Sequence, residues 1–475
     1  MTATNQHQLP LVTFLVSACI AIGFAAGVAV GIQPLFMGLG VVVILALTYF
    51  FASFSQAVLV LLIVRSSVDI FSQLQIPSVL AVGIDILTLM YVTKMLLQQQ
   101  KVHTDSFWWF FVAWIMMQAL WVVLLPLGGL GLDGAYLVDS LREWVRLFSW
   151  LMLYLLVMQL KDHVEPSVML SQLLLGLIPP ISLALLQMFL PSILPPLLSA
   201  NAGGEIGALV SGTEIRIRGT FGHPNSFATY LLLFISLTWW KLGEAKNRLP
   251  WLLLLGVLSM FFVSTKALFS LMMLATFVLV LIAPRLNLLK IIGGILFFML
   301  VIGLFASTPF GQERLSSLAN TPLLNPDIDI SRAILLAQGD NNSFNWRLSQ
   351  WTYLLEQWQH YPLLGFGLGL STYVSTNQLL PHNDYVRALV EGGIVGFTTY
   401  ILFFFAQGAR LWSIIKSPLT ISSQRSLCLI LFAFLLAVPV GMITENIWSH
   451  TTMFFYWWTI LAIAGWQWKP HTTTP

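Results

Sequence analysis

The chain has 475 residues, of which 57% are hydrophobic and only 9% are charged, and its formal net charge is +3. A soluble globular domain carries about 25% charged residues, so this composition excludes an ordinary soluble protein and requires lipid as the solvent. Apolar runs recur along the whole length, which predicts an all-α polytopic membrane protein with one transmembrane domain over 1–475. We expect the lipid bilayer as a partner and no nucleic acid.

The apolar runs predict the transmembrane helices. The first run, 11–31, is too long for the core of a signal peptide and follows a start without Lys or Arg, so we interpret it as a retained helix. The runs 35–53 and 55–70 lie so close together that they can merge, so we expect about 12–14 spans. The others are 79–97, 107–125, 141–160, 168–190, 223–241, 249–264, 266–283, 289–306, 393–412, 427–445 and 450–468.

Positive charge predicts the topology. Of the 22 Lys and Arg residues, twelve lie on one alternating set of connections, which the positive-inside rule makes cytoplasmic. Both termini are then cytoplasmic. The two long connections, 191–222 and 307–392, face the outside, and the larger of them lies between late spans. The twelve residues are Lys94, Lys101, Lys161, Lys241, Lys246, Arg248, Arg285, Lys290, Arg410, Lys416, Arg425 and Lys469.

The other ten basic residues lie outside or in the outer half of a span, against this bias. Acidic neighbours can hold them there, or an anionic ligand at the outer membrane face can do so. Two of them, Arg142 and Arg146, share one face of their predicted helix. The ten are Arg65, Arg142, Arg146, Arg216, Arg218, Lys266, Arg314, Arg332, Arg347 and Arg387.

The external connection 191–222 carries two arginines that are two residues apart. If the backbone is extended there, Arg216 and Arg218 project from one face, with their backbones roughly 7 Å apart. Two guanidinium groups on one side suit two linked phosphates, because each can bind oxygens in pairs. The alternative is a solvated basic strand. His223 is either a second acid/base group or an ordinary loop residue before the next span.

The external connection 307–392 contains two further patterns. Trp346, Trp351 and Trp358 partly follow helical spacing, which indicates an amphipathic helix on the outer leaflet with Arg347 at its start. The glycine-rich run 365–369 favours a loop over a nucleotide site, because no strand–helix–strand unit surrounds it. Another short pattern, Asp327 with Asp329, can hold a divalent cation, but it is a single match and we expect no metal.

His382 is the sharpest single candidate for chemistry. Asn383 is a good helix N-cap, and 384–391 can form two helical turns closed by Gly392 and Gly393. His382 then lies just before a helix N-terminus, whose dipole favours a neutral imidazole that can accept a proton from a hydroxyl. The alternative is a capping histidine without catalytic work. Arg387 and Glu391 are spaced to pair with each other.

Three of these patterns resemble the O-antigen ligase/polymerase superfamily. They are Arg218-Gly-Thr-Phe-Gly-His-Pro-Asn225 ahead of a span, Arg347 with Trp351 and the segment 362–369, and His382-Asn383 followed after nine residues by Gly393. The last fits the ligase pattern of the superfamily. Lys266 stands where similar proteins often carry arginine, which is a departure.

The resemblance implies a GT-C-like glycosyltransferase that needs no metal and no cofactor. Similar proteins take a glycan from an undecaprenyl-diphosphate carrier at the outer face of the cytoplasmic (inner) membrane and join it, with inversion, to a glycan or lipid A-core-type acceptor. His382 would be the catalytic base. The diphosphate would be held by Arg216, Arg218, Arg142, Arg146, Arg347 and Arg387, with support from Asn383, Glu391, Gly393 and His223.

Other functions remain open. The same superfamily contains polysaccharide polymerases and protein O-oligosaccharyltransferases, and the ligase pattern only leans towards a ligase. A bicarbonate-type solute transporter belongs to another class, and it would require charged or broken helices near the bilayer midplane. Here most basic residues cluster at one face instead. The residues that would line a transport path are Asp69, Asp85, Arg142, Arg146 and Glu445.

Overall fold

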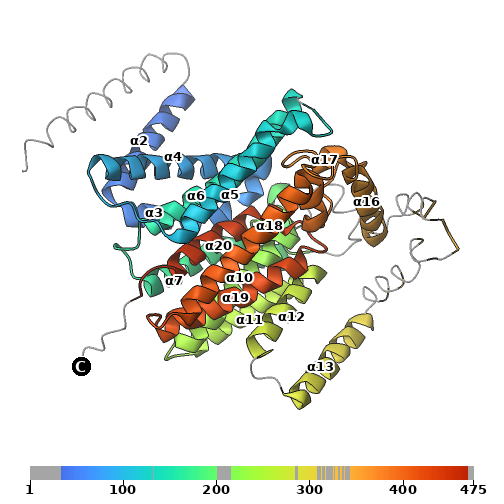
Figure 1. Cartoon of the computed structure of the whole chain (residues 1–475). Coiled ribbons are helices and arrows are strands. Elements are labelled where there is room, and N and C mark those ends of the chain that lie inside the picture. The colour runs from blue at the N-terminus through green and yellow to red at the C-terminus, as the bar shows by residue number, and fades with distance from the viewer. Residues whose placement is uncertain are drawn as a thin grey trace, which may run out of the picture. The chain divides into compact units, whose positions relative to one another are not determined.

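The computed structural model describes residues 34–131, 133–200, 216–283, 287–307 and 343–468, with a few separate residues between 308 and 342. All regular elements in these ranges are helical, which confirms the predicted all-α fold (Figure 1). The predicted span 11–31 and most of the external connections lie outside the described residues.

The helices confirm a polytopic membrane protein. Five helical segments in the described ranges are long and apolar enough to cross a bilayer, and shorter apolar helices of 10–17 residues accompany them. The total of 12–14 spans stays a prediction. The five segments are α4 (Ile76–Leu97), α5 (Ser106–Val123), the run Pro166–Phe189 that contains α7 (Pro166–Leu173) and α8 (Ile178–Phe189), α18 (Asp384–Lys416) and α19 (Ser422–Gly441).

The chain divides into two compact units, residues 1–61 and 62–475, and the single transmembrane domain stays a prediction. In the first unit, α2 (Pro34–Ala52) is followed after one residue by α3 (Phe54–Val64), which continues into the second unit. The backbone stays hydrogen-bonded across this join, since the amide of Ser53 donates to the carbonyl of Tyr49 at 2.8 Å. The two expected spans therefore follow each other almost directly.

The centre of the second unit is α20 (Thr451–Ala464), whose side chains are nearly all buried. It packs against α6 (Gly134–Met158) and α10 (Pro224–Glu244). Aromatic rings make much of this packing: the centroids of Trp150 and Phe454 are 4.6 Å apart. In lipid such close packing, rather than removal of apolar surface from water, holds helices together. The remaining long helices are α11 (Leu249–Ser264), α12 (Leu268–Ile282) and α13 (Leu288–Ala306).

The end of the large external connection folds onto the start of α18. It contains α16 (Ser343–Trp358) and the short α17 (Ser371–Val374), and both contact α18 (Figure 1). Leu354 and Phe366 pack there against Val390. The predicted amphipathic helix is thus present as α16, and it packs against α18, the helix that follows His382.

The predicted break at Gly392 and Gly393 takes a different form. The helix does not end there, because α18 continues through both glycines to Lys416 with one kink at Gly393, where φ is 61° and ψ is −165°. A Cβ atom at this position would lie 2.3 Å from the carbonyl of Leu363. Only glycine has both the backbone conformation and the space that this contact needs.

We predict that Gly393→Ala destabilises the protein by about 2 kcal/mol or more, through the unfavourable φ and the overlap with Leu363. Gly408→Ala is the matched control in the same helix, since its Cβ would meet side-chain atoms at an ordinary 3.6 Å. The control should be neutral or slightly stabilising. Thermal unfolding in detergent measures both, and equal melting temperatures for the two variants would contradict this account of the kink.

Candidate functional site

His382 lies one residue before Asn383, the N-cap of α18, and its φ of 49° is in the left-handed region of the backbone. The side-chain oxygen of Asn383 accepts hydrogen bonds from the amides of Tyr385 and Val386, both at 3.0 Å, which confirms the predicted N-cap. The imidazole packs edge-on against Trp346 of α16 and is 24% exposed. Its Nδ1 atom is 3.2 Å from Oε1 of Glu445, a carboxylate 63 residues away in the chain.

Glu445 is buried in the connection 442–450 between α19 and α20. Burial alone raises the pKa of this carboxyl, but the imidazole of His382 and its hydrogen bond, together with His450 and Arg347, hold the pKa well below its usual range. The guanidinium of Arg347 and the hydrogen bonds to His382, Asn225 and the backbone amide of Asn446 favour the ionised carboxylate also when both imidazoles are neutral. When the N–H group at Nδ1 of His382 donates a hydrogen bond to such a carboxylate, Nε2 carries no proton and can accept one.

The same carboxylate is joined to the first external loop. Its second oxygen accepts a hydrogen bond from the side-chain amide of Asn225. The amide oxygen of Asn225 in turn accepts from Arg216 at 2.8 Å, and the backbone N–H of Asn225 donates to Nδ1 of His223 at 3.1 Å. One hydrogen-bonded chain thus connects Arg216, Asn225, Glu445 and His382, which lie in three separate parts of the sequence.

Arg347 approaches this cluster from α16. Its guanidinium donates to the carbonyl of Thr444 at 3.2 Å, directly beside Glu445. Arg216 also donates to the carbonyl of Thr265 at 2.9 Å, one residue before Lys266. Two of the six arginines expected to hold a diphosphate are therefore next to the His382–Glu445 pair.

Arg218 has different surroundings from Arg216. Its side chain is buried, and its guanidinium donates to the carbonyls of Leu197 at 2.7 Å, Ser199 at 3.0 Å and Gly222 at 3.2 Å. These hydrogen bonds connect residues 197–199 with residues 218–222 before α10. The hydrogen bonds described here for Arg216 and Arg218 go to different groups, whereas their spacing predicts a common ligand.

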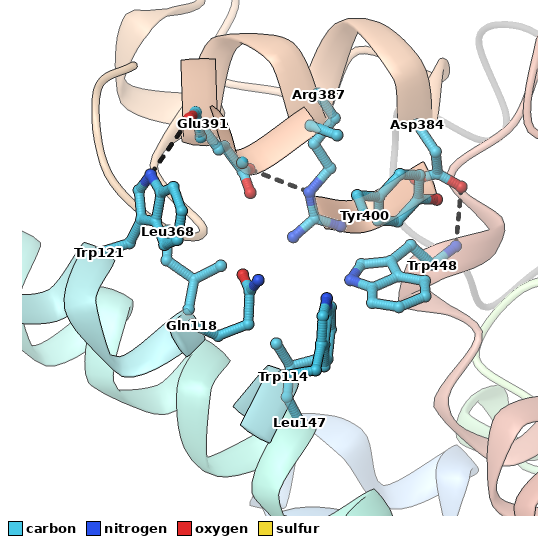
Figure 2. Close-up of a pocket in the computed structure, with 13 residues that line it drawn as sticks. Trp114, Gln118, Trp121, Leu147, Leu368, Asp384, Arg387, Glu391, Tyr400 and Trp448 are labelled. Atoms are coloured by element: carbon cyan, nitrogen blue, oxygen red, sulfur yellow. Dashed lines mark hydrogen bonds and ion pairs between the residues drawn. The ribbon is translucent and has the colours of Figure 1, made fainter. Parts of the chain in front are cut away.

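Arg387 is the centre of a buried ionic network (Figure 2). It donates to Glu391 at 2.9 Å, to Glu143 of α6 at 3.0 Å and to the hydroxyl of Ser449 at 2.8 Å. The pairing with Glu391 that the spacing indicated is confirmed. A cavity of only about 40 Å³ lies beside it, and its lining includes Trp114, Trp121 and Trp448. With its donors engaged, Arg387 connects α18 to α6.

Glu391 also positions the glycine-rich loop. It accepts hydrogen bonds from the backbone amide of Gly369 at 3.0 Å and from the hydroxyl of Ser371 at 2.6 Å. The amide of Gly367 donates to its backbone carbonyl at 2.9 Å. The run 365–369 is thus a loop fastened to α18, as the sequence favoured.

Arg142 and Arg146 lie on α6 beside a cavity of about 520 Å³. The side chain of Arg142 is 76% exposed and pairs with Asp139, whereas Arg146 pairs with Glu143 and lies 4.7 Å from the ring centroid of Trp150. Arg65 lines the same cavity. The wall of the cavity is otherwise mostly apolar and includes Val82, Ile84, Val138, Leu141, Val145 and Phe455.

Sequence reasoning did not connect Glu445 and Asn225 with His382. In the sequence, Glu445 is only an ionisable residue in an apolar region, at the end of the predicted span 427–445. In the structure α19 ends at Gly441, so Glu445 belongs to the connection that follows. The available signal was an acidic residue at the outer end of an apolar run, which is costly in lipid and therefore a candidate for function.

Comparison with known proteins identifies the domain. No curated protein shows significant similarity to the chain. A family model described as O-antigen ligase matches residues 251–401, a segment that includes Arg347, His382, Arg387 and the kink at Gly393. The family implies a membrane glycosyltransferase-like enzyme in general terms. The match over residues 251–401 supports an O-antigen ligase-like domain in this part of the chain.

Proposed function

We propose that this protein transfers a glycan from an undecaprenyl-diphosphate carrier to a hydroxyl group of an acceptor sugar, with His382 as the general base. The observation that carries the proposal is the contact of 3.2 Å between Nδ1 of His382 and the buried carboxylate of Glu445. This carboxylate selects the tautomer in which Nε2 is free to take a proton. The arrangement follows the logic of the Ser-His-Asp triad, in which an acid orients the histidine.

The proposed reaction is a single displacement. The acceptor oxygen attacks the anomeric carbon of the glycan, and a new C–O bond forms as the bond between that carbon and the diphosphate oxygen breaks. The proton of the acceptor hydroxyl passes to His382, and the carrier leaves as undecaprenyl diphosphate. One displacement inverts the anomeric configuration. Glu445 stabilises the imidazolium that forms.

Negative charge grows on the leaving diphosphate, so cations help most when they are near the reacting carbon. Arg216 and Arg347 meet this requirement because both are next to the His382–Glu445 pair. We therefore assign the leaving diphosphate to these two arginines. Arg218 and Arg387 are left out of the assignment, because their hydrogen bonds go to other parts of the protein, such as the carbonyl of Leu197 for Arg218 and the carboxylate of Glu391 for Arg387.

We place this reaction at the outer face of the cytoplasmic membrane, with both termini in the cytoplasm. The support is the bias of positive charge towards the alternate connections. Arg216, His382 and Glu445 all belong to the opposite set, before α10, before α18 and between α19 and α20. Ligase, polymerase and protein O-oligosaccharyltransferase activities share this chemistry and differ in the acceptor.

Transport of a small solute has less support. Asp69, one of the residues expected along a transport path, is bound by Arg65 and by the hydroxyl of Thr452. Asp85 accepts a hydrogen bond from Ser149 at 2.6 Å. These carboxylates hold helices and loops together, so no separate observation favours a transporter.

His382→Ala should lower the turnover of glycan transfer by about 10²–10⁴-fold, because the general base is lost. Glu445→Gln keeps the shape of the side chain but removes its charge, and a loss of similar size is expected, with KM for the donor little changed. Transfer is measured with purified protein, an undecaprenyl-diphosphate oligosaccharide and candidate acceptors. Glu356→Gln, on the exposed side of α16, is the control. Full activity of Glu445→Gln would contradict the proposal that Glu445 orients His382.

Arg347→Gln and Arg216→Gln should each lower turnover by about 10²–10³-fold, the usual effect of removing one donor that stabilises charge in the transition state. Arg425→Gln, an exposed arginine at the start of α19, is the matched control and should keep full activity. All assays are repeated with EDTA, which we expect to have no effect. Loss of transfer in EDTA would overturn the metal-free mechanism and favour Asp327 and Asp329 as ligands of a divalent cation.

A further inference from the structure

The connection that carries Glu445 has little regular structure of its own. It lies between the end of α19 at Gly441 and the start of α20 at Thr451, and its regular structure is limited to the 3₁₀ turn Ile447–Ser449. Irregular backbone keeps its conformational freedom unless other parts of the molecule bind it. The contact of 3.2 Å between Glu445 and His382 therefore depends on what holds this connection in place.

Asp384 binds the connection on both sides of Glu445. Its backbone N–H donates to the carbonyl of Met442 at 3.0 Å, and its Oδ2 atom accepts from the backbone N–H of Trp448 at 2.8 Å (Figure 2). Met442 precedes Glu445 by three residues, and Trp448 follows it by three. Asp384 itself is two residues after His382. These two hydrogen bonds, the Asp384 bridge, thus join the segment of the base to the segment of its carboxylate.

The surroundings of Asp384 give little reason for a carboxyl group on grounds of stability alone. The residue is only 1% exposed, and its Oδ1 atom has no hydrogen-bond partner in the part of the chain that the structure describes. Burial of a polar group costs free energy, which the single hydrogen bond from Trp448 offsets only in part. The distinct effect of the side chain is therefore its hold on the connection.

The nearby ionic network does not require a charge on Asp384. Arg387 pairs with Glu391 and Glu143, and Arg146 also pairs with Glu143. These four side chains carry two positive and two negative charges, which balance each other. A neutral amide at position 384 would therefore leave both arginines paired.

We propose that Asp384 is a positioning residue of the reaction, which fixes Glu445 beside His382 by bridging Met442 and Trp448. The inference rests on the proposed function, in which Glu445 orients His382 as the base. Groups that take part in a reaction must be held within about 0.5 Å of their productive geometry. Without the side-chain half of the bridge, the connection can shift, and the imidazole is correctly oriented in fewer molecules.

Three substitutions of Asp384 separate the position of the acceptor atom from its charge. Asp384→Asn keeps an oxygen of the same reach and removes the charge. Asp384→Ala removes the acceptor. Asp384→Glu keeps the charge but moves the carboxylate one methylene further out, and the cavity of about 40 Å³ that Asp384 lines leaves room for the longer side chain. The backbone hydrogen bond to Met442 is possible in all three variants.

Asp384→Ala should lower the turnover of glycan transfer by about 10²-fold with KM for the donor little changed, the usual cost of a misplacement of about 1 Å at a reacting group. Asp384→Glu should also lower it, whereas Asp384→Asn should keep most of the turnover. In a Glu445→Gln background, Asp384→Ala should add little further loss, because it acts through the carboxylate that is already gone. A merely structural residue would cause the same additional loss in both backgrounds.

Asp105→Ala is the matched control. Asp105 also accepts a backbone N–H, from Trp108 at 2.8 Å, and it pairs with Arg410 near the other end of α18. Its removal should lower the melting temperature of the protein, since an N-cap and an ion pair are lost. The turnover per folded molecule should stay the same with either Glu or Gln at position 445.

Hydrogen exchange of the purified full chain in detergent tests the bridge without any transfer assay. The backbone amides of 442–450 should exchange several-fold faster in Asp384→Ala, and at the unchanged rate in Asp384→Asn and Asp105→Ala. If Asp384→Ala does not fold, the contrast between Asp384→Asn and Asp384→Glu provides the same test. Unchanged exchange in every variant of Asp384 would overturn the inference.

The kinetic results separate the remaining explanations. Full turnover in Asp384→Ala, or losses that add to that of Glu445→Gln, would overturn the inference. Equal losses in Asp384→Ala and Asp384→Asn would also overturn it, and would assign the residue to the dipole of α18, which requires the charge. Failure of the unchanged protein to transfer any glycan would refute the proposed function, while faster exchange in Asp384→Ala would still show that the bridge holds the connection.

Discussion

The buried carboxylate of Glu445 is the group on which the candidate site depends. An ionised carboxylate removed from water is costly unless it is paired and hydrogen-bonded. Here the imidazole of His382, the amide of Asn225 and the backbone amide of Asn446 satisfy it. These partners belong to the start of α10, to the residue before the N-cap of α18 and to the connection after α19, so burial of this one charge requires those three parts of the chain to meet. An unpaired buried carboxylate would cost free energy, so the same contacts that hold these parts of the chain together also position Glu445 beside His382.

A second buried network holds the start of α18 in place. Arg387 joins Glu391 of its own helix to Glu143 of α6, and Ser449 joins the network from the connection before α20. The start of α18 is therefore held on two sides. His382 lies one residue before the N-cap of that helix, so its imidazole is positioned by an element that cannot easily shift. Such support lets a hydrogen bond of 3.2 Å act as an orienting contact.

The distribution of arginines separates structural from chemical roles. Arg218 and Arg387 are buried and engaged by carbonyls and carboxylates, whereas Arg142 borders an open cavity and keeps most of its side chain exposed. Arg216 and Arg347 lie between these extremes, beside the proposed base. In the proposed reaction, cations are needed where negative charge grows on the leaving diphosphate, and the positions of Arg216 and Arg347 meet that need.

Much of the fold was determined by the sequence alone, because lipid imposes simple rules on it. The low charge and the apolar runs predicted an all-α membrane protein, and Asn383 and the spacing of Arg387 and Glu391 predicted local contacts that the structure contains. Each of these depends on residues within a few positions of one another. The break expected at Gly393 became a kink inside a longer helix, since the contact with Leu363 comes from another segment.

Only the tertiary structure decided which charged residues belong together. His382 and Glu445 are 63 residues apart, and Asn225 is 220 residues from Glu445, so no local pattern links them. The six arginines looked alike in the sequence, because residue type and predicted side of the membrane were the only criteria. Burial and hydrogen-bond partners separated them. Helix periodicity and hydrophobicity act over neighbouring residues, whereas the pairing of buried charges depends on which helix ends meet in space.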